Sequence, residues 1–67
     1  MIVISLNGQP RQLDNEATVA QLLQQLGYVG KRVAVEQNGE IVPKGRHAQA
    51  RIAEGDHLEI VVAVGGG

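Results

Sequence analysis

The chain has 67 residues and a formal net charge of −1, from six Lys and Arg against seven Asp and Glu, and it contains no cysteine. This length suits one small domain, and the lack of cysteine excludes a disulfide framework, a thiolate metal site and a catalytic thiol. The weak net charge and the single aromatic residue, Tyr28, argue against nucleic-acid binding.

The first part of the chain predicts a hairpin. In residues 2–6 apolar side chains alternate, which is typical of a strand with one buried face. Asn7 and Gly8 both tolerate a positive φ and therefore predict a tight turn. The following residues, 10–14, are mostly polar and include Pro10, so we expect a second strand at an edge of the sheet.

A helix of about nine residues follows, which is too short to be stable unless it packs against a sheet. Thr18 is the expected N-cap, with Glu16 nearby to interact with the helix dipole. Gly27 stands where a left-handed C-cap is expected. The predicted buried face has the helical spacing i, i+3, i+4, i+7 and consists of Val19, Leu22, Leu23 and Leu26.

The second half of the chain predicts three further strands. Residues 33–36 alternate, Asn38-Gly39 is a second turn signal, and residues 40–42 form a short return strand that Pro43 stops. Residues 44–53 lack periodicity and are interpreted as a loop with at most one helical turn. A last strand over residues 58–64 is apolar on both faces near its end, which indicates a central position in the sheet.

The order of these elements predicts an α+β fold in which the first and last strands lie side by side and parallel. Parallel neighbours need a long crossover, which the helix supplies. The expected architecture is the β-grasp, or ubiquitin-like, fold: a mixed sheet of four to five strands with one helix packed across it. We expect residues 1–64 to form this domain and residues 65–67 a flexible tail. In this register Val62 is buried, whereas Val3, Val61 and Ala63 lie on the opposite face.

No catalytic or metal-binding set is visible in the sequence. The two histidines, His47 and His57, and the one serine, Ser5, have no partner at a suitable spacing and are interpreted as surface residues. We therefore expect a protein that is not an enzyme and binds no metal. The apolar run over residues 60–64 is too short to span a membrane, and no targeting segment is visible at the N-terminus, so we expect no membrane association and a cytoplasmic location.

The terminal glycines are the remaining candidate for chemistry. Three glycines contribute little as structure, and a frayed end is the alternative interpretation. Extended, however, they reach about 10 Å, enough to thread a narrow enzyme channel. The Gly67 carboxylate, ionised at neutral pH, can attack the α-phosphate of ATP, and a sulfur nucleophile can then displace AMP to give a thiocarboxylate. The chain would then be a substrate and carrier for a partner enzyme.

Three segments carry a resemblance to a known family: residues 33–44, which include Ile41-Val42-Pro43-Lys44, residues 54–61, and the terminal glycines. With these segments the chain resembles the sulfur carriers of thiamine biosynthesis, the ThiS-like proteins. The resemblance implies that an adenylyltransferase uses ATP to activate Gly67, that a persulfide enzyme supplies sulfur, and that thiazole synthase receives it. Gly65 and Gly66 would thread into partner active sites, with Gly65 additional to the diglycine. No bound cofactor is implied.

Two alternatives remain open from the sequence. One is the small subunit of molybdopterin synthase, although those chains are longer and richer in phenylalanine, which this chain lacks. The other is a non-covalent ubiquitin-like adaptor that uses the sheet face of Val3, Val61 and Ala63. The same face would serve a carrier as its docking face. Loss of Gly66 and Gly67 separates the two classes, because only a carrier needs them.

Overall fold

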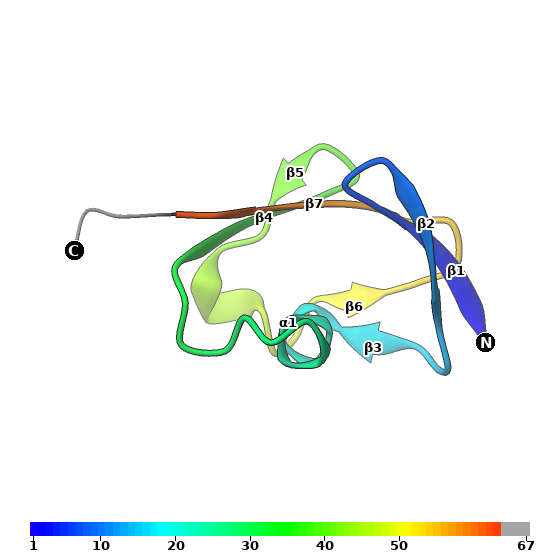
Figure 1. The fold of residues 1–67 in the computed structure, drawn as a ribbon, viewed down its shortest axis with the longest axis horizontal. Coiled ribbons are helices and arrows are strands. Elements are labelled where there is room, and N and C mark those ends of the chain that lie inside the picture. Colours follow the sequence, from blue (N-terminus) through cyan, green and yellow to red (C-terminus); the bar gives the residue numbers. More distant parts are fainter. Residues whose placement is uncertain (64–67) are drawn as a thin grey trace.

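A computed structural model describes residues 1–63, in which seven strands, one α-helix and one 3₁₀ helix follow one another (Figure 1). The predicted end of the last strand, Val64, and the predicted tail, residues 65–67, lie outside the described residues. Within residues 1–63 no helix is long and apolar enough to cross a membrane. The elements are β1 (Ile2–Leu6), β2 (Gln9–Leu13), β3 (Ala17–Thr18), α1 (Val19–Gln25), β4 (Val33–Gln37), β5 (Glu40–Ile41), η1 (Lys44–Arg46), β6 (Arg51–Ile52) and β7 (His57–Val62).

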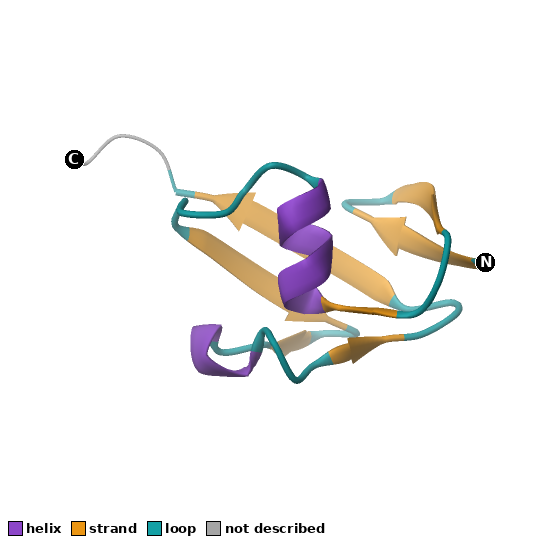
Figure 2. Ribbon diagram, turned by 90° about the horizontal axis from the view of Figure 1, so that it is seen from below, coloured by secondary structure: helices purple, strands orange, loops and turns teal. Residues whose placement is uncertain are grey.

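Five strands form one mixed sheet in the order β2-β1-β7-β4-β5. The pair β1–β7 is parallel, with Ser5 opposite His57, and the other neighbours are antiparallel. The polar β2 lies at an edge, and α1 lies across one face of the sheet (Figure 2). The predicted α+β arrangement, with the first and last strands as parallel central neighbours, is therefore confirmed.

The helix begins and ends at the predicted signals. The Thr18 hydroxyl accepts a hydrogen bond from the Gln21 N–H (3.2 Å), and the Gln21 side chain accepts one from the Thr18 N–H (2.9 Å), which completes a capping box. At the other end Gly27 has φ 78°, its N–H donates to Gln24 O, and the Tyr28 N–H donates to Leu23 O. These two bonds form a Schellman motif, which ends the helix after seven residues.

The core lies between α1 and the inner face of the sheet. Val19 and Leu22 are fully buried, and Leu23 is nearly so, as the helical spacing predicts. Leu26 caps the helix and is half-buried. The remaining buried apolar side chains are Ile4, Leu13, Ala17, Val35, Ile52, Leu58 and Ile60.

The segment of residues 44–53 is more ordered than a loop. It contains η1, which matches the single helical turn in the prediction. It also contains β6, which pairs antiparallel with β3 and forms a separate two-stranded sheet. Ile52 in β6 is fully buried. The sequence prediction missed both strands, because two residues are too few to show an alternating pattern.

The central strand β7 is buried on one face only. Leu58 and Ile60 point into the core, whereas Val61 is 65% exposed. Val62, predicted to be buried, is half-buried because it lies where the sheet ends. The strand is apolar on both faces because one face packs in the core, whereas the other carries Val61 on the exposed side of the sheet.

Candidate functional site at the end of the central strand

The last described part of the chain is held firmly to β4. Val62 lies opposite Val33, Val61 lies opposite Ala34, and beyond the strand the Ala63 N–H donates to Arg32 O (2.9 Å). The parallel pairing with β1 ends much earlier, at Leu58. Beyond Leu58 the strand pairing of β7 is with β4 alone. Figure 1 shows β7 running out to the border of the domain. The predicted reactive residue Gly67 and the threading residues Gly65 and Gly66 lie outside the described residues.

An exposed apolar patch, called here the end patch, lies on the outer face beside this strand end. It consists of Ala34, Val61 and Ala63, all exposed, and Ala34 and Val61 are direct cross-strand neighbours. The structure thus places two of the three predicted docking residues, Val61 and Ala63, at the end of the described part of the chain. Ala34 belongs with them, and only the strand register reveals it.

The third predicted docking residue, Val3, is exposed but lies elsewhere. The Gly55 N–H donates to Val3 O (2.9 Å), so Val3 is level with the start of β7. Val61 is about six residues further along, roughly 20 Å at the rise of an extended strand. Val3 therefore lies on the uncovered face but is not part of the end patch.

Two acidic residues continue the outer face beside the end patch. Glu36 in β4 lies directly opposite Glu59 in β7, and like charges in this arrangement repel each other. Glu36 also lies opposite Ile41 of β5, which is 65% exposed. An apolar patch beside an acidic pair suits a protein partner that offers an apolar contact and a basic group.

Two asparagine side chains hold β7 in place. In both turns the Asn and the Gly have positive φ, as predicted from their sequence. In addition, Asn7 Oδ1 accepts from the Ile60 N–H (2.8 Å) and its Nδ2 donates to Ile60 O (3.2 Å), while Asn38 Oδ1 accepts from the His57 N–H (2.9 Å). These side-chain hydrogen bonds to the backbone of β7 add to the backbone hydrogen bonds that pair the strand with its neighbours.

Asp56 organises the turn that leads into β7. Its Oδ2 accepts from the Ala53 N–H and from Gln37 Nε2 (both 2.9 Å), and its Oδ1 accepts from Asn38 Nδ2 (3.1 Å). Burial by itself raises the pKa of this carboxyl group, but the three hydrogen bonds and the neighbouring His57 outweigh burial and lower the pKa below its ordinary value. The arrangement stabilises a turn and contains no catalytic pair.

The remaining candidates from the sequence are dispersed. His57 is exposed, Ser5 is half-buried in β1, and His47 Nε2 lies 3.1 Å from Val42 O. In the part of the chain that the structure describes, no three His, Cys, Asp or Glu side chains form a group that could hold a metal ion.

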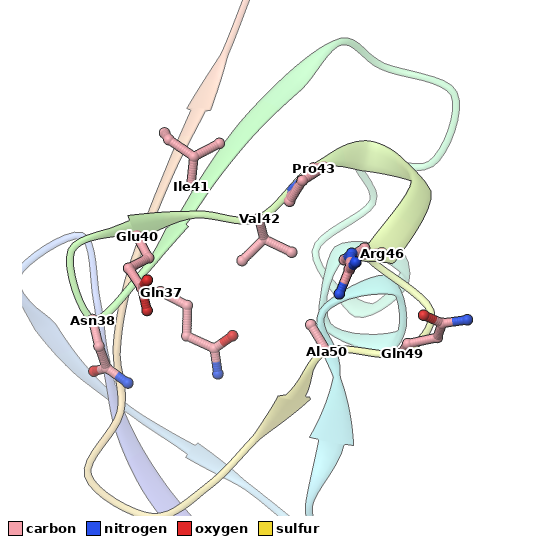
Figure 3. A pocket seen from close by; sticks show the side chains of 9 residues that line it. All are labelled: Gln37, Asn38, Glu40, Ile41, Val42, Pro43, Arg46, Gln49 and Ala50. Carbon is pink, nitrogen blue, oxygen red and sulfur yellow. The ribbon is translucent and has the colours of Figure 1, made fainter.

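A groove of about 340 Å³ lies between the β4–β5 hairpin and η1 (Figure 3). Glu40 and Arg46 are the charged residues that line it, and the rest of its lining is amide or apolar. Figure 3 shows Ile41 and Val42 projecting to opposite sides of the chain, so Ile41 belongs to the outer face. The groove offers no nucleophile with an adjacent base, which covalent catalysis requires.

The fold and the site together define a class: a ubiquitin-like β-grasp domain that presents the end of its central strand. The model of the ThiS family matches residues 4–67. The chain belongs to the ThiS family.

Similar proteins agree with this assignment. The crystal structure of a thiamine biosynthesis protein (ThiS) from Geobacter metallireducens superposes with a TM-score of 0.84 at 29% identity, covering 98% of this chain and 100% of that one. A sulfur carrier protein ThiS from Bacillus subtilis is 35% identical over 97% of this chain and all of its own length.

Two further relatives are longer proteins. Thiazole synthase from Paramagnetospirillum magneticum is 48% identical over 62 residues, and thiazole synthase from Magnetococcus marinus is 38% identical over 64 residues. The matches cover 92% and 96% of this chain. The chain spans only about a fifth of the length of either relative, 19% and 20% respectively.

Proposed function

We propose that this chain is the sulfur carrier of thiazole formation in thiamine biosynthesis, with the α-carboxylate of Gly67 as the group that is loaded. The observation that carries the proposal is the match of the ThiS family model through residue 67, which includes the terminal glycines. The firm anchoring of β7 as far as Ala63 supports it, because a carrier must deliver its end in a defined direction. The chain acts as a substrate, and partner enzymes supply the catalysis.

The first step activates the carboxylate. Its pKa is about 3.3–3.7 in model peptides, so it is anionic at neutral pH and a poor electrophile. An oxygen of the carboxylate attacks the α-phosphorus of ATP on an adenylyltransferase, and pyrophosphate leaves. The product is an acyl-adenylate with AMP as a good leaving group.

The second step introduces sulfur. A sulfur nucleophile attacks the acyl carbon and expels AMP. Where the nucleophile is an enzyme persulfide, a thiol then attacks the enzyme's sulfur atom of the S–S bond, forms a disulfide with it and releases the thiocarboxylate as the leaving group. Thiazole synthase is the proposed acceptor of this sulfur, and the two relatives of that name support this partner. Gly65 and Gly66 have no side chains and would fit a narrow channel in either enzyme.

The end patch is the proposed docking surface for these enzymes. Val61 and Ala63 lie at the end of the described residues, and Glu36 and Glu59 supply charge beside them. Val3 lies too far along the sheet to belong to the same contact.

The experiment compares the natural chain with a chain whose Gly67 carboxylate is amidated, which keeps the length and removes the nucleophile. With adenylyltransferase and ATP, the natural chain should release pyrophosphate and the amidated chain should not, while both melt at the same temperature. A chain without Gly66 and Gly67 should likewise be inactive. Equal support of thiazole formation by the natural and amidated chains would show a non-covalent adaptor instead.

A further inference from the structure

A second hollow, of about 300 Å³, opens on the helix side of the domain. Residues of α1, of the connection from α1 to β4 and of η1 line it (Figure 1). Its lining comes from segments far apart in the sequence, including Leu23 of α1, Tyr28 and Val29 of the connection, and Lys44 of η1.

The hollow combines an apolar surface with a basic rim. Leu23, Tyr28 and Val29 form apolar lining, and Val29 is 69% exposed although it is a large apolar side chain. Lys31, Arg32 and Lys44 also line it, which are three of the six basic residues of the chain. None of the seven acidic residues lines this hollow. The hollow is therefore positively charged, although the chain as a whole has a net charge of −1.

The hollow lies next to the end of the central strand. Arg32, which lines it, accepts the hydrogen bond of the Ala63 N–H through its backbone carbonyl. Val33, which also lines it, lies opposite Val62. A protein that receives the end of β7 is therefore within reach of the hollow on one side of the sheet and of the end patch on the other.

We propose that this hollow receives an acidic segment of thiazole synthase, with a carboxylate between Lys31 and Lys44 and an adjacent apolar side chain against Val29. The inference rests on the proposed function. Charge complementarity argues for an acidic occupant, since opposite potentials steer association and select the partner. The exposed Val29 argues for a polypeptide segment, because a free inorganic anion would leave it uncovered. Two relatives named thiazole synthase carry a stretch similar to this chain, which supports that enzyme as the partner.

The test measures the dissociation constant between the full chain and thiazole synthase of the same host by titration calorimetry at several salt concentrations. The variant Lys31→Glu/Lys44→Glu is compared with Arg11→Glu/Arg51→Glu, which makes the same change of charge at exposed positions outside the hollow. The first variant should weaken binding by about tenfold and flatten the salt dependence, and the second should stay near the natural affinity. Thermal melting checks the fold of both, and Lys31→Gln/Lys44→Gln replaces the first variant if it melts early.

The outcomes separate the two proposals. Unchanged binding of the hollow variant, or an equal loss in both variants, overturns the inference and leaves the carrier function standing. No binding between the natural chain and thiazole synthase overturns the proposed partner and the inference together.

Discussion

Single side chains decide how the central strand is held. Asn7 reaches a residue 53 positions later in the chain and satisfies both backbone groups of Ile60. The sequence predicts the turn at Asn7, because the preference for positive φ is local. It cannot predict the bonds to Ile60, because they depend on the parallel pairing of β1 and β7.

Replacing Asn7 by Gly should separate these two roles. Glycine keeps the positive φ and loses both hydrogen bonds, so we expect the free energy of unfolding to fall by about 1–2 kcal/mol in urea denaturation. Asn7→Asp keeps an acceptor for the Ile60 N–H and is the matched control, with a smaller loss. Full stability of Asn7→Gly would mean that the side-chain bonds contribute nothing.

Asp56 should make stability depend on pH in the acid range. Because its folded pKa is lowered, the carboxylate stabilises the fold above its unfolded pKa of about 3.9, and this contribution is lost as pH falls through the folded pKa. In Asp56→Asn this part of the pH dependence should be missing. Urea unfolding of both proteins between neutral pH and the acid range measures it, and parallel curves would contradict the assignment.

Among the helices and strands, those with a clear periodic pattern of apolar residues were predicted, whereas the two-residue strands β3 and β6 were missed. The four apolar residues at helical spacing predicted α1, and the alternation of apolar side chains predicted β1 and β7; the structure contains all three elements. The strands β3 and β6 have two residues each, and Ile52 is buried only because they meet. Val62 shows a related limit: alternation places it on the inner face but does not show where the sheet ends.

The outer face of the sheet should contain one docking region at the end of β7. We expect Val61→Asp to weaken binding to the adenylyltransferase by about tenfold or more, since it puts a charge into an apolar contact. Val3→Asp makes the same change on the same face and should leave binding nearly unchanged. Both side chains are exposed, so both variants should fold.

Surface plasmon resonance with immobilised adenylyltransferase measures both affinities. Equal losses in the two variants would mean that the docking region includes Val3 as well as Val61, as the sequence alone predicted. No loss in either would remove the end patch from the interface.

In the whole molecule, as far as residues 1–63 describe it, the side chains that could take part in catalysis or bind a metal do not lie together. Its two histidines lie apart, and its core is built from aliphatic side chains. The Asp56 carboxylate, which accepts three hydrogen bonds, stabilises a turn. The sequence predicted this architecture because pattern, turns and caps all agree. It did not predict the basic hollow, because residues 28–33 and 44–47 meet only in the fold. The role of Gly67 stays a prediction.

We propose that partner enzymes load sulfur onto the end of this chain and remove it again. The most direct measurement is the intact mass of the protein isolated from its own host grown without thiamine. We predict a species in which one oxygen is replaced by sulfur, located by fragmentation at Gly67 and absent when the host lacks the adenylyltransferase. Finding only the unmodified mass while the host makes thiazole through this protein would show that Gly67 does not carry the sulfur.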